Sequence, residues 1–323
     1  MPQQTNLNVS PYFDDFDSAN DYHKVLFKPG YPLQARELTT LQSILQGQIE
    51  KFGQHFFKDG DKVIPGNTGY SNLYQCVQLN NSFQGVPVSA YADQLIGSKI
   101  TGQSSGVTAY VDYVLFPEDS ERGTLTLYVN YLGSSIQNNS TQIFNNGESL
   151  VSNQTITSGL LGNTTIQPGS PFASTISNSS SATGSSFSID EGVYFIRGSF
   201  VSVSKETLIL DQYSNTPSYR VGLFINEEIV TSDSDESLND NSQGFNNYSA
   251  PGADRLKISV SLTKKQLDDF DDTNFVELAT VTNGVLKSKK IIGGSISSGN
   301  GGFRAKDVSD TLARRTYAES GDY

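Results

Sequence analysis

Residues 107–131, VTAYVDYVLFPEDSERGTLTLYVNY, decide the fold class, because apolar and polar side chains alternate in them on either side of a polar turn. Alternation with a period of two is typical of β-strands that have one face buried. The residues expected to share a face are Val107, Ala109, Val111, Tyr113 and Leu115 on the first strand, and Leu125, Leu127, Val129 and Tyr131 on the second. The connector at residues 117–123 is rich in turn formers, so the stretch predicts an antiparallel hairpin.

The same alternation recurs in the C-terminal half of the chain. It is clearest at Leu256, Ile258, Val260 and Leu262, and it is also present at residues 193–203 and 219–225. No helical stretch of 10–15 residues separates these strands, as a parallel sheet would require. Residues 264–272 are expected to add one short helix. The sequence therefore predicts a mainly β fold of antiparallel, β-sandwich-like domains with one long N-terminal amphipathic helix.

That amphipathic helix is predicted at residues 33–57. Its apolar residues are spaced by 3, 4, 4, 3 and 4 positions and form one stripe along about 36 Å of helix; they are Leu38, Leu41, Leu45, Ile49, Phe52 and Phe56. The stripe repeats every eleven residues, which favours a straight or slightly right-handed bundle. Its partner is either the chain's own β domain or the same helix of neighbouring copies. We expect the stripe to be an oligomerisation surface in a parallel bundle of three copies.

An extended arm precedes the helix, where aromatic residues are interleaved with aspartates over residues 6–21. The arm has too few apolar residues to fold alone, so it is expected to dock on another surface. The candidate docking residues are Tyr12, Phe13, Asp14, Asp15 and Phe16. Two destinations remain open at this level, namely the arm's own domain or a neighbouring subunit.

Composition and charge bear on several classes of function. The net charge of −12 makes the surface repel phosphates, and no basic patch is evident, so neither nucleic-acid nor membrane binding is expected. The chain has a single cysteine, Cys76, without a nearby histidine, and no zinc, phosphate-loop or nucleophile-elbow motif. We therefore expect no enzyme activity, no metal site and no cofactor.

Four regions follow from these patterns. Residues 1–31 form the extended docking arm, and residues 32–95 the amphipathic helix with the first strands. Residues 96–186 form a Ser/Asn-rich β-hairpin module or insertion, and residues 187–323 an antiparallel β domain. Between Gly123 and Ile189 the only charged residue is Glu148. A flexible linker, a glycosylated stalk and neutral β structure are all compatible with that composition, and apolar pairs such as Leu150–Val151 favour β structure.

Five segments of the chain carry a resemblance to a known family. They are NLNVSPYFDDFD at residues 6–17, FKPGYPLQAREL at 27–38, DEGVYFIRG at 190–198, NTPSYRVG at 215–222 and APGADR at 250–255. They resemble a family of virion structural proteins of large contractile-tailed bacteriophages, notably those that infect cyanobacteria. The resemblance covers residues 6–90 and 187–323, and it offers no catalytic residues.

The resemblance implies a structural protein of the phage tail that joins the baseplate to the tail fibres. Its partners would be its own copies, as a homotrimer, together with other baseplate and tail-fibre proteins. It would be located in the virion, after assembly in the host cytoplasm. The alternative is a host-surface carbohydrate-binding protein or depolymerase. A hollow lined by paired carboxylates and tyrosines would favour that alternative.

Overall fold

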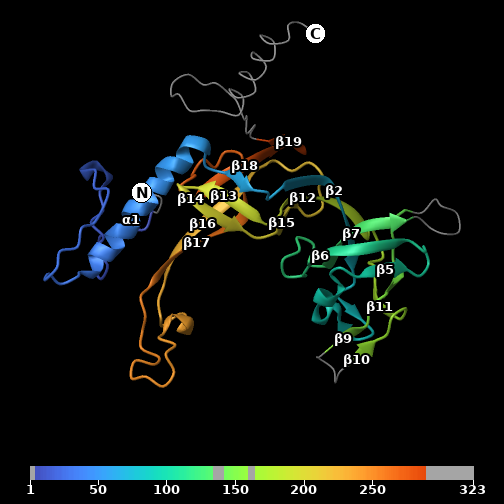
Figure 1. Cartoon of the computed structure of the whole chain (residues 1–323). Coiled ribbons are helices and arrows are strands. Elements are labelled where there is room, and N and C mark those ends of the chain that lie inside the picture. The colour runs from blue at the N-terminus through green and yellow to red at the C-terminus, as the bar shows by residue number, and fades with distance from the viewer. Residues whose placement is uncertain (1–3, 134–141, 159–163, 289–323) are drawn as a thin grey trace, which may run out of the picture.

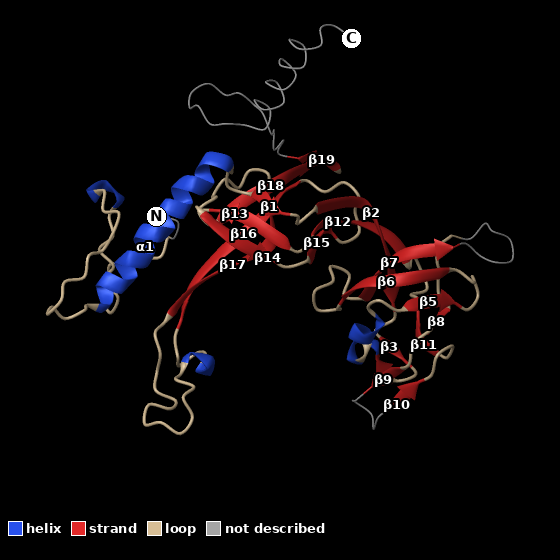
Figure 2. Cartoon of the chain, viewed as in Figure 1, coloured by secondary structure: helices blue, strands red, loops and turns tan. Residues whose placement is uncertain are grey.

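The computed structural model describes residues 4–133, 142–158 and 164–288. Antiparallel sheets dominate these residues, and one α-helix, α1 (Ala35–Phe56), lies beside them (Figures 1 and 2). Both the mainly β class and the single long helix predicted from the sequence are therefore confirmed. Four short 3₁₀ turns complete the described helices; they are η1 (Ser18–Asn20), η2 (Val88–Ala90), η3 (Ala92–Leu95) and η4 (Glu236–Leu238).

The largest sheet has eight strands in the order β11-β8-β5-β6-β7-β2-β12-β15. Their bounds are β2 (Thr68–Leu79), β5 (Lys99–Gly102), β6 (Thr108–Leu115), β7 (Leu125–Gly133), β8 (Ser149–Ser152), β11 (Pro171–Ser174), β12 (Ser181–Ile189) and β15 (Glu206–Asp211). Strands β6 and β7 pair antiparallel and are the hairpin predicted at residues 107–131. One hydrophobic core lies against β2, β5–β8, β11 and the turns η2 and η3.

Strand β6 departs from strict alternation at one point. Val111 pairs with Val129 and Tyr113 pairs with Tyr128, so Asp112 is an extra residue, a β-bulge. The bulge moves Tyr113 to the exposed side and leaves Val114 and Leu115 buried. The prediction that Tyr113 and Leu115 share the face of Val111 was therefore wrong, because a single inserted residue reverses the facing of the side chains that follow, and Leu115 packs with Tyr74, Cys76 and Tyr128 instead.

Two further sheets contain the C-terminal strands, and one of them also contains β1 from the N-terminal part of the chain. A three-stranded sheet has the order β1-β13-β14, and a four-stranded sheet has the order β17-β16-β18-β19. Their bounds are β1 (Asp61–Ile64), β13 (Gly192–Ile196), β14 (Ser199–Val203), β16 (Tyr219–Val230), β17 (Arg255–Lys265), β18 (Phe275–Thr282) and β19 (Val285–Ser288). A second core joins β12 and β15 to β13, β14 and β16–β18. The smallest pairs are β3 (Ser82–Phe83) with β4 (Val86–Pro87), and β9 (Ile156–Ser158) with β10 (Thr164–Ile166).

The short helix expected at residues 264–272 is absent, because β17 continues through Lys265, which pairs with Arg220 of β16. The Lys264 ammonium donates to the backbone carbonyls of Ile209 and Leu210 and lies 4.9 Å from the centre of the Tyr219 ring. These contacts hold the backbone in the sheet. Lys265 and Asp269, which are four residues apart as in a helical pair, form an ion pair of 3.5 Å across the turn that follows β17.

The described part of the Ser/Asn-rich stretch forms strands β8–β12, joined by turns. Its one charged residue, Glu148, is buried and accepts hydrogen bonds from the backbone and hydroxyl groups of Ser104 and Ser105 and from the Asn145 N–H. Since a buried carboxylate is costly unless its oxygens are hydrogen-bonded, Glu148 organises this loop cluster. The domain boundary expected at residue 186 falls inside β12.

Candidate interaction surface on the N-terminal helix

Helix α1 begins two residues later and ends one residue earlier than the sequence predicted, which is ordinary variation at helix ends. At its N-terminus the Glu37 carboxylate accepts the Gln34 N–H at 3.0 Å, as in a capping box. Arg36 donates to the Gln34 side chain at 2.6 Å and pairs with Asp15 of the arm at 3.1 Å. Local capping therefore sets the start of the helix, and the arm is attached beside it.

Two glycines let α1 approach the β domain and the arm closely. A Cβ atom added at Gly53 would lie 2.3 Å from Cε2 of Phe195, far inside contact distance. Gln46 of the same helix donates to the Ser199 hydroxyl at 3.2 Å. A Cβ atom added at Gly47 would lie 3.3 Å from Cζ of Phe16 in the arm. Glycine weakens an isolated helix, and here it makes room for two aromatic rings.

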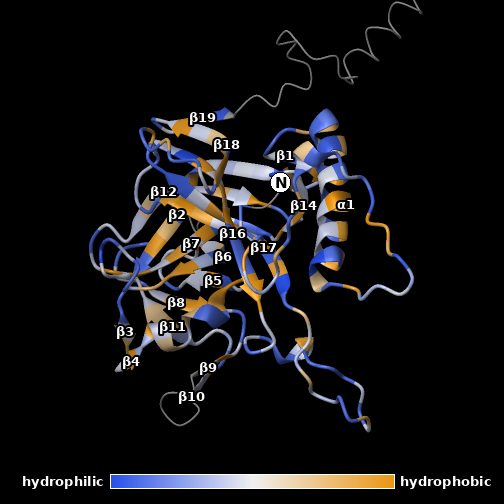
Figure 3. Cartoon of the chain, turned by 90° about the vertical axis from the view of Figure 1, so that its left-hand side faces the viewer, coloured by the Kyte–Doolittle hydropathy of each residue, from blue (hydrophilic) through white to orange (hydrophobic). Residues whose placement is uncertain are grey.

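The apolar stripe occupies another face of α1. Five of its six side chains, all except the half-buried Leu41, are between 44% and 64% exposed. The buried positions of the helix are instead Ile44, Gly47 and Gly53. This second face leaves no apolar period in the sequence, because two of its three members are glycines. Figure 3 shows α1 at the margin of the β structure.

The arm lies on its own chain in this structure. The Asp14 carboxylate is 1% exposed and accepts hydrogen bonds from Ser43 at 2.5 Å and from Thr40 at 3.2 Å. The Phe16 ring lies against Gly47 of the helix. Of the candidate docking residues, Asp14, Asp15 and Phe16 therefore contact α1, whereas Phe13 is 53% exposed. Among the five candidate docking residues, Phe13 is therefore the one whose large apolar side chain a neighbour could cover.

A second anchor ties the start of the arm to the C-terminal sheets. The Glu227 carboxylate accepts the backbone N–H groups of Gln4 and Thr5 and pairs with Arg197 at 3.0 Å. Burial acts to raise the pKa of Glu227, but these hydrogen bonds outweigh it and hold the pKa below its ordinary value. Farther along the arm, the Tyr12 hydroxyl donates to Asp254 at 2.6 Å. None of these long-range partners could be read from the sequence.

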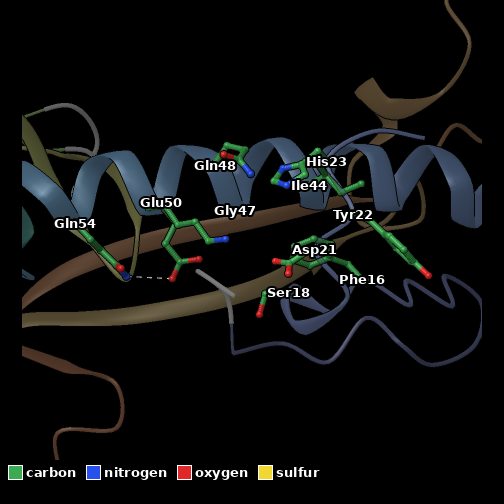
Figure 4. A pocket seen from close by; sticks show the side chains of 11 residues that line it. Phe16, Ser18, Asp21, Tyr22, His23, Ile44, Gly47, Gln48, Glu50 and Gln54 are labelled. Atoms are coloured by element: carbon green, nitrogen blue, oxygen red, sulfur yellow. Dashed lines mark hydrogen bonds between the residues drawn. The ribbon is translucent and has the colours of Figure 1, made fainter. Parts of the chain in front are cut away.

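The arm and α1 enclose a small hollow of about 210 Å³ (Figure 4). Asp21 and His23 of the arm line it together with Glu50 and Gln54 of the helix, and Gln54 donates to Glu50 at 3.2 Å. The lining is mostly polar and opens to solvent, so the hollow can hold water or a polar group. No nucleophile is paired with a base there, and we assign it no chemistry.

Other reactive groups in the described residues are held in the sheets. Cys76 is buried on β2, and burial raises the pKa of its thiol to about 12, which disfavours the reactive thiolate. Across residues 4–133, 142–158 and 164–288, no group of three or more His, Cys, Asp and Glu side chains is placed to hold a metal ion. None of the helices that the structure describes has the length and apolar character needed to span a bilayer.

Fold and surface together define a mainly antiparallel β protein that carries an amphipathic helix with its apolar stripe exposed. The chain belongs to the family described as a domain of unknown function, DUF4815, which matches residues 10–78 and 146–323. Comparison with curated proteins and with solved structures gave no match. The unmatched residues 79–145 contain β3–β7, of which β7 pairs with the family-matched β2 and β5 pairs with the family-matched β8.

Proposed function

We propose that this protein is a structural component of a bacteriophage tail that joins the baseplate to the tail fibres and self-associates as a homotrimer through α1. The sequence resemblance to virion proteins of contractile-tailed phages, notably cyanophages, supports the assignment to a phage tail. On this proposal the protein is located in the virion, after assembly in the host cytoplasm. Its partners are its own copies and other baseplate and tail-fibre proteins.

The observation that carries the proposal is the exposed apolar stripe of α1. A continuous row of leucine, isoleucine and phenylalanine side chains on a solvent-facing helix is what soluble monomers usually avoid. The chain's own domain and arm already occupy Ile44, Gly47 and Gly53, so they cannot also cover the stripe without undocking the helix. The Phe52 and Phe56 rings, with centroids 5.1 Å apart, form the largest apolar group on it.

A second copy of the same helix is the partner that this stripe fits best. Its period of eleven residues lets identical helices align along their length with little supercoiling. Full burial of a leucine or phenylalanine contributes ~1.5–3 kcal/mol, so covering half-exposed side chains contributes about 1 kcal/mol each. The stripe then supplies several kcal/mol per subunit, comparable with the ~4–15 kcal/mol that association costs. The stripe therefore offsets the cost of association, and a trimer at micromolar concentration needs about 8 kcal/mol more from contacts outside the stripe.

A charge-insertion experiment tests the proposal. The double variant Leu45→Glu, Phe52→Glu places carboxylates on the stripe at side chains that are already exposed, so the subunit should stay folded. The matched control is Leu73→Glu, Phe245→Glu, which changes a leucine and a phenylalanine that are 64% and 74% exposed outside the helix. Circular dichroism checks the fold, and light scattering reports the mass.

We expect the unmodified protein and the control to have the mass of a trimer and the helix variant to have that of a monomer. The helix variant should also be absent from assembled particles. If the unmodified protein is monomeric at micromolar concentration, or if both double variants assemble alike, the stripe is not the self-association surface. Unfolding of the helix variant would mean instead that the stripe packs inside its own subunit.

We also infer that the protein acts without catalysis, metal or cofactor. The inference is supported by the absence of nucleophile, zinc and phosphate-loop motifs from the sequence. Metal analysis of the purified protein and a screen against host polysaccharides test it. Stoichiometric zinc, or cleavage of a polysaccharide that is lost on replacing one carboxylate, would contradict the inference.

A further inference from the structure

A second hollow, of about 530 Å³, is lined by strands β2, β6 and β15 of the eight-stranded sheet and by Lys205, which directly precedes β15. Its volume falls within the ~300–1,000 Å³ that is usual for small-molecule sites. The lining residues come from three places in the chain: Tyr74 on β2, Asp112 and Tyr113 on β6, and Lys205, Glu206 and Thr207 at the start of β15. Two tyrosines and two carboxylates therefore line one hollow, which is the arrangement that the sequence analysis associated with carbohydrate binding.

The β-bulge in β6 creates one wall of this hollow. Because Asp112 is the inserted residue, both Asp112 and the next side chain, Tyr113, face outward instead of alternating. Bulges are enriched next to functional sites, where they redirect a side chain. Without the bulge, Tyr113 would lie on the buried face of the sheet. With it, Tyr113 is 38% exposed and lines the hollow.

A stack of aromatic rings supports Tyr113 from below. Its ring centroid lies 6.2 Å from that of Tyr128, which is stacked on Tyr74 with centroids 4.6 Å apart. The Tyr128 hydroxyl donates to the Gln212 carbonyl at 3.0 Å, and the Tyr74 hydroxyl donates to Asp112 Oδ2 at 2.5 Å. Burial and the neighbouring Asp112 raise the pKa of Tyr74, so it stays a donor. The exposed ring thus packs against two buried, hydrogen-bonded tyrosines.

The polar groups of the hollow leave hydrogen-bonding capacity open. Asp112 uses Oδ2 for Tyr74, and its Oδ1 has no hydrogen-bond partner among the described residues. Glu206 accepts the Leu262 N–H through Oε2 at 2.8 Å. Lys205 makes no ion pair with any residue that the structure describes. An open acceptor and an open donor therefore line the same hollow as the exposed ring.

The charges of the hollow select among ligands. Two carboxylates and one ammonium give it a net negative charge, on a chain whose net charge is −12, so phosphates and acidic sugars are disfavoured. A pyranose ring fits the remaining chemistry, because its C–H face packs on an aromatic ring while its hydroxyls both donate and accept. A basic peptide side chain could pair with Asp112, but it would face Lys205.

We propose that this hollow binds a neutral oligosaccharide, with one sugar ring stacked on Tyr113 and its hydroxyls hydrogen-bonded to Asp112 and Lys205. The site lies at the junction of the family-matched and unmatched parts of the chain, since Tyr74 and Lys205 lie inside the family match and Asp112 and Tyr113 lie outside it. Binding needs no bond cleavage and does not depend on α1, so it goes beyond the structural role proposed above.

The test measures binding of the full-length protein to an array of neutral oligosaccharides that contain hexoses, deoxyhexoses and N-acetylhexosamines. The same array carries sialylated glycans, sulfated glycans and basic peptides as competing ligand classes. The variant Tyr113→Ala removes the stacking ring. Its matched control is Tyr110→Ala, which truncates a tyrosine of the same strand that is 45% exposed and does not line the hollow. A second variant, Lys205→Ala, removes the donor without touching the sheet. Circular dichroism and light scattering establish that the variants fold and assemble like the unmodified protein.

We expect at least one neutral oligosaccharide to bind, with affinity reduced about tenfold or more in Tyr113→Ala, which corresponds to ~1.4 kcal/mol. Lys205→Ala should weaken binding as well, and Tyr110→Ala should leave it unchanged. Absence of binding across the neutral glycans, preference for acidic glycans or basic peptides, or equal losses in Tyr110→Ala and Tyr113→Ala would each overturn the proposal. The assembly state is measured separately, so failure here leaves the structural role untouched.

Discussion

Replacing Gly53 and Gly47 of α1 separately by alanine should change stability in opposite directions, although the two substitutions are chemically identical. Alanine is favoured over glycine in a helix interior by ~1 kcal/mol. At Gly47 the new Cβ atom would lie 3.3 Å from Phe16 Cζ, at the edge of a ring in the arm that can move by a few tenths of an ångström. We therefore expect Gly47→Ala to stabilise the protein by about 0.5–1 kcal/mol.

At Gly53 the steric cost is larger than the helical gain. The new Cβ atom would lie 2.3 Å and 2.8 Å from two atoms of the Phe195 ring. That ring is buried and packs against Phe57 and Phe200, with centroid distances of 5.8 Å and 5.4 Å, so it has little room to retreat. Overpacking of this kind costs ~1–3 kcal/mol. After subtraction of the helix-propensity gain of ~1 kcal/mol, Gly53→Ala should lose up to about 2 kcal/mol.

Urea unfolding followed by circular dichroism measures both changes as shifts of the midpoint at constant slope. Combining Gly53→Ala with Phe195→Leu in a double-mutant cycle should recover part of the loss, because the smaller side chain makes room for the methyl group. If Gly53→Ala is as stable as Gly47→Ala, α1 does not pack closely on Phe195. The account of which face the helix buries would then be wrong.

Three further predictions concern buried polar groups. Asp14→Asn removes the charged acceptor of the Ser43 hydroxyl, so it should cost about 1–2 kcal/mol and expose residues 1–31 to limited proteolysis while the sheets stay protected. Glu227→Gln should lower stability at pH 7 by about 1–3 kcal/mol through loss of the ionised partner of Arg197. The folded-state pKa of Glu227 lies below its ordinary value of 4.5, so its stabilisation is complete above pH 4.5 and is lost as the pH falls through the folded-state pKa. The difference in unfolding free energy between wild type and variant should therefore shrink in acid. A difference that stays constant with pH would refute the assignment. Cys76, with a pKa raised to about 12 by burial, should react with a thiol reagent only after denaturation, and rapid labelling of the native protein would contradict its placement.

The two β regions and the long helix could be predicted from the sequence because their signals are local. Alternation at residues 107–131 and 256–262 predicts which residues lie on the same face of a sheet. The spacing of three and four at residues 38–56 predicts which residues lie on the same face of a helix. The same reasoning failed at Tyr113, since a bulge is an extra residue relative to a partner strand. It failed at residues 264–272 because pairing with β16 outweighed local preference.

The sequence by itself therefore determined the fold class, the helix with its apolar stripe, and the acidic surface, since each depends on residue type and spacing along the chain. Only the tertiary structure decided which helix face is buried, because Gly47 and Gly53 have no side chain for a pattern to detect and matter only beside Phe16 and Phe195. It also decided that Tyr74, Tyr113 and Lys205 line one hollow. Such groupings depend on how distant strands pair and curve, and no spacing along one chain encodes that contact directly.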